Sequence, residues 1–171
     1  MTTIEPATAE FTMTVLMTPD KANFSGKVHG GALLKLLDEV AYACASRYAG
    51  RYCVTLSVDQ VTFREAIHVG ELVHFMARVN YTGTSSMEVG IKVVAENIRE
   101  RSVRHVNSCF FTMVAMGDDG RPTPVPPLSP DDEDGRRRFE QGRRRRELRA
   151  ENAERLAAIK AAAPADLVAP R

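Results

Sequence analysis

The feature that most constrains the fold is a segment, residues 32–49, that is apolar on nearly every side of a helix. It contains strong helix formers and no proline, and Gly50 follows it as a stop signal. A helix of this kind must be covered on most sides by other elements. Its apolar members are Leu33, Leu34, Leu36, Leu37, Val40, Ala41, Ala43 and Cys44.

The rest of the first 116 residues can supply this cover as strands. Strand-like runs rich in Val, Ile, Phe and Thr lie at 11–17, 54–63, 72–81, 87–97 and 106–116. The last four runs are consecutive, and the short turn signals between them favour an antiparallel meander. The order of one strand, one apolar helix and four strands predicts an α+β fold in which a single curved sheet wraps around the helix.

Composition excludes several other classes of protein. The chain has 171 residues, of which 44% are hydrophobic and 26% charged, which is typical of a globular protein with a buried core. It lacks both an apolar run of about 18 residues and the pattern of a secretory signal, so we expect a cytoplasmic protein without a membrane partner. Cys44, Cys53 and Cys109 have neither the spacing of a zinc site nor the number of a disulfide framework, and no metal is expected.

The charge pattern divides the chain into parts. Residues 1–117 carry 11 basic and 11 acidic side chains, whereas five prolines between 122 and 130 and the acidic run 131–134 mark a break. We therefore expect a folded domain at 8–118, a proline-rich and acidic linker at 119–135 and a charged helical or disordered tail at 136–171. Glutamates dilute the arginines of this tail and only one aromatic residue, Phe139, lies among them, so a nucleic-acid partner is not expected.

Polar groups gather around the start of the apolar helix. Asn23 lies in the preceding loop, His29, Gly30 and Gly31 lie at the helix start, and Asp38 follows about two turns later. A helix N-terminus offers free N–H groups to a developing oxyanion, and glycine lets a substrate approach the backbone closely. A carboxylate nearby can accept a proton from water. The combination suits attack of water on an acyl group.

Each of these residues also has a structural interpretation. Asp38 alone fits a structural acid hydrogen-bonded across a subunit interface as well as it fits a catalytic acid. Asn23 is of a type common in turns, and His29 fits a capping or packing residue as well as a base. The residues alone therefore predict a ligand-binding α+β domain with a site at the helix start.

The motif around these residues resembles a known family. The stretch Asn23-x-x-Gly26-x-x-His29-Gly30-Gly31, followed by Asp38-Glu39-Val40-Ala41, is similar to the signature of hotdog-fold acyl-CoA thioesterases of the brain-type cytosolic acyl-CoA hydrolase group. The resemblance covers about residues 11–117 and continues through Val54-Thr55, Ser57-Val58-Asp59, Val69-Gly70 and Thr84-Ser85-Ser86. It departs from the family at Ala66, where proline is usual, and at Glu71, where aspartate is frequent. It implies the hotdog fold, a long central helix wrapped by an antiparallel sheet.

The resemblance also implies a reaction, the hydrolysis of fatty acyl-CoA to a free fatty acid and CoA. Asp38 would act as general base or as nucleophile, and Asn23 from the opposite subunit of a dimer would hold the attacking water. The backbone amide of Gly31, with Gly30 and His29 beside it, would bind the thioester carbonyl. The turn Gly83-Thr84-Ser85-Ser86 would contact the CoA, with a plain hairpin turn as its structural alternative.

The same resemblance implies the partners and cofactors. No cofactor is implied, because CoA is part of the substrate and product. Self-association as a hotdog dimer is expected, with trimers of dimers frequent in the family. Two alternatives stay open: a hotdog protein that binds acyl-CoA without hydrolysing it, and an enoyl-CoA hydratase-like enzyme with His29 as base.

Overall fold

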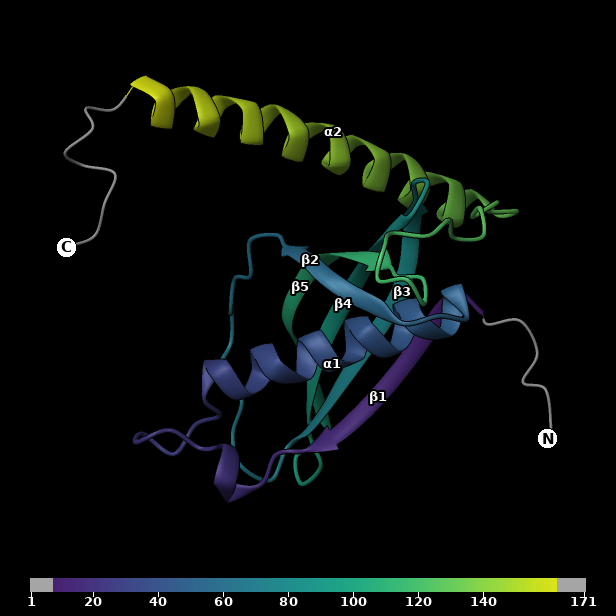
Figure 1. Cartoon of the computed structure of the whole chain (residues 1–171). Coiled ribbons are helices and arrows are strands. Elements are labelled where there is room, and N and C mark those ends of the chain that lie inside the picture. Colours follow the sequence, from purple (N-terminus) through teal and green to yellow (C-terminus); the bar gives the residue numbers. More distant parts are fainter. Residues whose placement is uncertain (1–7, 163–171) are drawn as a thin grey trace. The chain divides into compact units, whose positions relative to one another are not determined.

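The computed structural model describes residues 8–162, which form two compact units, one up to Ser129 and one from Pro130. In the first unit, the described residues form a five-stranded antiparallel sheet and one long α-helix (Figure 1). The predicted α+β class is thereby confirmed, with the architecture of a hotdog fold. In chain order the elements are β1 (Glu10–Leu16), a 3-10 helix η1 (Pro19–Lys21), α1 (Gly30–Ala49), β2 (Cys53–Val58), β3 (Leu72–Thr82), β4 (Ser86–Asn97) and β5 (Ser102–Ala115).

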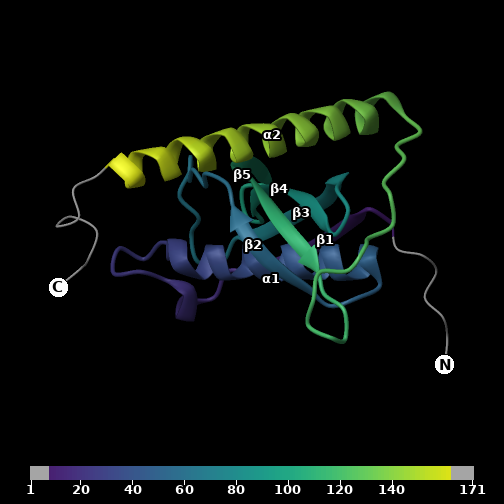
Figure 2. The same cartoon turned by 45° about the horizontal axis from the view of Figure 1, so that its top comes forward.

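The strand order across the sheet is β1-β3-β4-β5-β2. The predicted meander is confirmed for β3, β4 and β5, because their short connections leave room only for antiparallel neighbours. The expectation that β2 begins this meander is wrong. The longer connection 59–71 crosses over, so β2 pairs with β5 at the sheet edge, where Val54 lies opposite Val114 (Figure 2). The strand also ends at Val58 rather than at residue 63.

The sheet buries one side of α1 and leaves another side open. The helix contacts all five strands and lies across one face of the sheet (Figure 1). Its opposite side carries Leu34 and Tyr42, which are 42% and 43% exposed. A single sheet that wraps around one helix was expected to leave one flank of it open, and these exposed side chains mark that flank. The buried residues are Leu33, Leu37, Val40, Ala41, Cys44 and Ala45.

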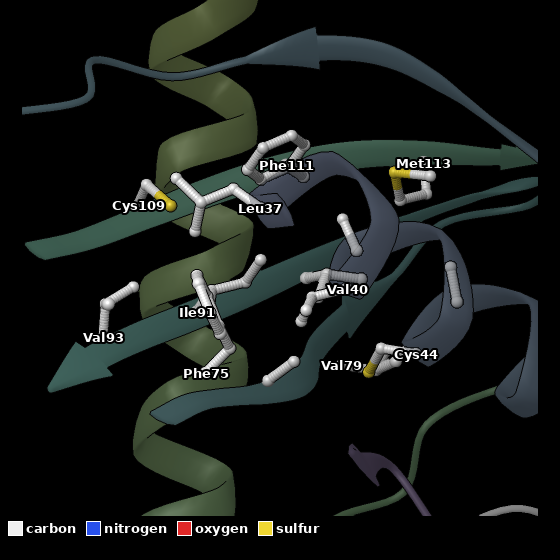
Figure 3. Close-up of a cluster of buried hydrophobic side chains, with 14 of the residues drawn as sticks. Leu37, Val40, Cys44, Phe75, Val79, Ile91, Val93, Cys109, Phe111 and Met113 are labelled. Carbon is white, nitrogen blue, oxygen red and sulfur yellow. The ribbon is translucent and has the colours of Figure 1, made fainter. Parts of the chain in front are cut away.

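The buried helix face and the inner face of the sheet form one hydrophobic core. Alternate residues of β3 and β4 are buried, as their sequences predicted, except at a bulge between Val79 and Tyr81. There Asn80 and Glu88 are also buried, and Tyr81, which was expected to face inward, is only partly buried. Figure 3 shows Leu37 and Val40 of α1 packed among Phe75, Ile91 and Phe111 of the central strands. The core ties α1 to the sheet and so fixes the position of its N-terminus.

The proline-rich segment lies against the first unit instead of running free as a linker. The N–H of Thr123 donates to the carbonyl of Ala115 at 2.9 Å, and the N–H of Val125 donates to Thr84 at 3.0 Å. Residues between prolines keep their N–H groups, so the segment can still donate to the end of β5 and to the turn between β3 and β4. Val125 is 8% exposed and belongs to the core. These contacts explain why the first unit extends beyond residue 118.

The second unit contains α2 (Glu133–Ala162), which begins inside the segment expected to be a linker. Oppositely charged side chains pair along this helix. Asp134 pairs with Arg137 and Arg138, and Glu147 pairs with Arg143 and Arg144. Residues 163–171 of the expected tail lie outside the described residues. Across residues 8–162, neither α-helix is long and apolar enough to cross a membrane.

Candidate functional site

The start of α1 presents one free backbone amide. His29 caps the helix: its carbonyl accepts from Ala32 and Leu33, and its Nδ1 accepts the N–H of Gly31 at 3.0 Å. The N–H of Gly30 makes no hydrogen bond to any described residue, and it lies at the positive end of the helix dipole. Of the two amides predicted to contact a carbonyl, that of Gly30 is therefore free, whereas that of Gly31 is occupied by the His29 ring.

Asn23 lies in a cavity of about 200 Å³ together with Gly30. Its side-chain oxygen accepts from the N–H and hydroxyl of Ser25 at 2.9 and 2.8 Å and from the N–H of Lys27 at 3.2 Å. Asn23 thus closes its own loop, as the structural interpretation expected. Its Nδ2 group makes no hydrogen bond within residues 8–162, and it remains available to donate to a ligand oxygen. The other lining residues are Lys27, Val28, Leu33, Phe63, Glu65, Ala66 and Ile67.

Asp38 lies in a second cavity, of about 340 Å³, on the side of α1 that the sheet leaves open. The hydroxyl of Thr55 on β2 donates to Asp38 Oδ1 at 2.6 Å, a short charge-assisted hydrogen bond. The Oδ2 atom makes no hydrogen bond to the described residues. Tyr42 and Tyr52 line the same cavity, with ring centroids 6.0 Å apart. Asp38 therefore combines an oriented carboxylate with an aromatic wall.

The structure does not bring Asn23 and Asp38 together within one chain. Asn23 and Gly30 line the cavity at the start of α1, whereas Asp38 lines the cavity beside β2. Neither cavity contains both residues. A site that uses an amide, a free backbone N–H and a carboxylate is thus divided between two surfaces of the same molecule.

The turn from Gly83 to Ser86 lies at the far end of β3 from the Asn23 loop. The 11 residues of β3 separate the two ends by roughly 35 Å. The Gly83 N–H donates to the Ser86 carbonyl at 2.8 Å, and the carbonyls of Thr84 and Ser85 accept from Val125 and Ala115. The turn is thus a hairpin held from both sides. The hydroxyls of Thr84, Ser85 and Ser86 make no hydrogen bonds within residues 8–162, and contact with a ligand stays a prediction.

Thr55 is the residue that the sequence analysis missed. A threonine in a strand is ordinary, and it gains significance only when β2 lies beside α1. The one available signal was its place in the resembling stretch after Val54. For metals, a search of residues 8–162 finds no group of three or more His, Cys, Asp or Glu side chains that could hold an ion.

Comparison with known proteins finds clear relatives. The model of the thioesterase superfamily matches residues 25–102. Protein VdlD of Helicobacter pylori is 51% identical over 137 residues, which are 80% of this chain and 78% of that protein. The cytosolic acyl coenzyme A thioester hydrolase of Rattus norvegicus is 36% identical over 146 residues, covering 82% of this chain and 38% of the rat protein.

Solved structures extend this likeness. An apo-hexameric acyl-CoA thioesterase has a TM-score of 0.81 and 33% identity, over 85% of this chain and 93% of that one. An acyl-CoA hydrolase from Staphylococcus aureus, in complex with butyryl coenzyme A, coenzyme A and coenzyme A disulfide, has a TM-score of 0.78 and 28% identity, over 90% and 95%.

Three variants of the Staphylococcus aureus hydrolase are also among the similar structures. They replace an asparagine, an aspartate and a threonine by alanine. The three positions are 15 and 17 residues apart, and Asn23, Asp38 and Thr55 have the same spacing here.

Proposed function

The chain belongs to the acyl-CoA thioester hydrolases of the thioesterase superfamily, and from this membership we propose that it hydrolyses fatty acyl-CoA to a free fatty acid and coenzyme A. The observation that carries the proposal is the 2.6 Å hydrogen bond between Thr55 and Asp38, which orients a carboxylate in a cavity open to a ligand. We propose a cytoplasmic location, which the name of the rat relative supports.

In the proposed mechanism, Asp38 activates water. Its Oδ1 is held by Thr55, so Oδ2 accepts the proton while the water oxygen bonds to the thioester carbon. The carbonyl electrons move to the oxygen, and the free N–H of Gly30 stabilises this oxyanion at the helix N-terminus. Collapse of the tetrahedral intermediate expels the CoA thiolate. The Nδ2 group of Asn23 would donate to the water and fix its position.

His29 has a positioning role in this mechanism. Its Nδ1 holds the N–H of Gly31, which keeps the first helical turn closed and leaves Gly30 as the donor. Because that nitrogen is already an acceptor within the cap, a hydratase-like enzyme with His29 as the base is not favoured. The free hydroxyls of Thr84, Ser85 and Ser86 are the proposed contacts for the CoA.

The complete site is proposed to form between two copies of the chain. Asn23 and Asp38 lie in separate cavities, so one copy would supply the amide and the other the carboxylate. The surface around Asp38 is suited to such pairing, because Leu34 and Tyr42 on α1 and Leu56 on the edge strand β2 are exposed. Further assembly into trimers of dimers is also proposed, and the hexameric state of a similar thioesterase supports it.

The test of the reaction is thiol release from acyl-CoA of several chain lengths. We expect wild type to release thiol and Asp38→Asn to lose at least about 100-fold in kcat, the usual scale for loss of a general base. The control is Glu39→Gln, which changes the neighbouring carboxylate, paired with Lys35 at 3.8 Å, and should keep kcat. Acyl-CoA binding without turnover in wild type would instead favour a non-catalytic binding protein.

The test of the shared site is complementation between inactive variants. Asn23→Ala and Asp38→Asn are unfolded together, refolded as a mixture and assayed. If the residues act from different copies, half of the dimers are mixed and each contains one intact site, so about a quarter of wild-type activity returns. A mixture as inactive as its components would show that both residues act from the same copy.

A further inference from the structure

A buried ion pair holds the irregular connection 59–71 between β2 and β3. Glu71 is only 5% exposed, and both of its carboxylate oxygens accept from the guanidinium of Arg104 at 2.7 Å. The same guanidinium donates to the carbonyl of Ala66 at 2.5 Å, and the N–H of His68 donates to Glu71 Oε2 at 2.8 Å. Arg104 on β5 thus fixes both ends of the segment 66–71 through three hydrogen bonds.

The clamped segment is bonded directly to the loop that carries Asn23. The N–H of Val28 donates to the carbonyl of Ile67 at 2.8 Å, and Lys27 forms an antiparallel bridge with His68. Within the loop, the N–H of Asn23 donates to the carbonyl of Lys27 at 2.7 Å, and the N–H of Lys27 returns to Asn23 Oδ1. A continuous series of hydrogen bonds therefore leads from the ion pair to the amide of Asn23.

The same segment forms a wall of the cavity that contains Asn23 and Gly30. Ala66 and Ile67 line this cavity, so a shift of their backbone changes its shape directly. The connection contains no strand or helix of its own, although backbone hydrogen bonds join Gly70 and Glu71 to Met17 and join Arg64 to β5. Among its contacts, the bidentate pair with Arg104 has the most fixed geometry, because a planar guanidinium matches both carboxylate oxygens. Burial opposes the ionised carboxylate, but the hydrogen bonds from Arg104 outweigh it and hold the pKa of Glu71 below its ordinary value.

We infer that Arg104, through Glu71 and the segment 66–68, is a positioning residue that sets the place of Asn23 in the site. The inference rests on the proposed function, in which Asn23 orients the attacking water. Arg104 itself touches no substrate. Its loss moves the amide while leaving the Asp38 cavity on the other side of α1 intact, so the reaction slows with little change in substrate binding.

The kinetic test compares Arg104→Met with a matched control. Arg78 also pairs with a carboxylate, Glu10, at 3.2 Å, and its side chain is 28% exposed against 29% for Arg104. We expect Arg104→Met to lower kcat by about 10- to 100-fold with KM within about twofold, because a displacement near 1 Å can cost about 100-fold. Arg78→Met should leave both constants unchanged. A rise in KM alone, or an equal loss in both variants, would overturn the inference.

A variant cycle tests whether Arg104 acts through Asn23. When Asn23→Ala is already present, Arg104→Met should lower kcat by no more than about threefold further, because both changes remove the same contribution. Multiplicative losses would refute the route through Asn23. If Arg104→Met does not fold, Arg104→Lys replaces it. Lysine keeps the positive charge but cannot form the bidentate contact with both oxygens of Glu71, so its kcat should lie between those expected for wild type and for Arg104→Met.

Hydrogen exchange separates this inference from the proposed function. The amide of Val28, bonded to Ile67, should exchange at least about tenfold faster in Arg104→Met than in wild type or Arg78→Met. Unchanged exchange at Val28 would refute the clamp even if thiol release is confirmed. Suppose instead that the Val28 amide exchanges faster in Arg104→Met but wild type releases no thiol. The contacts of Arg104 would then hold the loop in place, but the proposed reaction would be refuted, and with it the role of Arg104 in placing a catalytic amide.

Discussion

Thr55→Val isolates the contribution of a single hydrogen bond to the proposed reaction. Valine keeps the branched shape that suits strand β2 and removes only the hydroxyl that donates to Asp38 Oδ1 at 2.6 Å. A hydrogen bond to a charged group contributes about 1.5–3 kcal/mol, and about 1.4 kcal/mol corresponds to a tenfold change in rate. We therefore expect kcat to fall by about 10- to 150-fold. The loss should lie near the lower end of this range if a water molecule takes the place of the hydroxyl as donor to Asp38.

The assay is steady-state thiol release followed with a chromogenic thiol reagent, together with a thermal melt of each variant. Thr55→Ser keeps the donor and should stay within about threefold of wild type, which makes it the matched control. If Thr55→Val turns over at the wild-type rate while Asp38→Asn is inactive, the carboxylate does not depend on Thr55 for its orientation. Asp38 would then remain the proposed base, but the hydrogen bond from Thr55 would have no role in the reaction.

Three further expectations concern stability. Leu37→Ala removes a fully buried helix side chain and should lower the free energy of unfolding by about 2–5 kcal/mol, whereas Leu37→Met should cost less than about 1.5 kcal/mol in the same urea titration. Because Arg104 lowers the pKa of Glu71 from 4.5, this carboxylate stabilises the fold above that pH and its contribution is lost as the pH falls below it. The urea midpoint of Glu71→Gln should consequently change less than that of wild type between pH 6 and pH 4. Arg138 and Arg137 lower the pKa of Asp134 from 3.8 to about 2. The part of the α2 helicity that depends on the ionised carboxylate should therefore be lost in wild type as the pH falls between those two values, as followed by far-UV circular dichroism. Asp134→Asn should show no such loss over the same pH range.

Local sequence patterns predicted the bounds of each element better than they predicted which element lies beside it in the sheet. The alternation in β3 and β4 placed both strands to within one residue of the observed bounds, because each strand buries one face. The helix was expected to begin at residue 32, but it begins at Gly30 because His29 caps it through its own ring nitrogen. Such a cap cannot be distinguished in advance from a catalytic histidine, since both require a histidine before the first turn.

The boundary between domain and tail shows another limit of composition. Repeated prolines predicted a separate linker, yet Thr123 donates to the end of β5, Val125 donates to the turn between β3 and β4, and Val125 enters the core. Proline removes a donor only at its own position, so the residues between prolines can still form hydrogen bonds. Whether such a segment finds acceptors depends on which strand ends and turns lie within reach, and that is a property of the folded sheet.

The sequence by itself determined features that depend on neighbours along the chain: the loop at Asn23, a helix that begins within two residues of Gly30, and most of the inward-facing residues of β3 and β4. Periodicity specifies which face of an element is buried, but not which strand lies beside it. Only the tertiary structure placed β2 next to β5 and alongside α1, and so joined Thr55 to Asp38 across 17 residues and Arg104 to Glu71 across 33. The division of Asn23 and Asp38 between two cavities has the same origin, because the sheet covers one side of α1 and leaves the other side open.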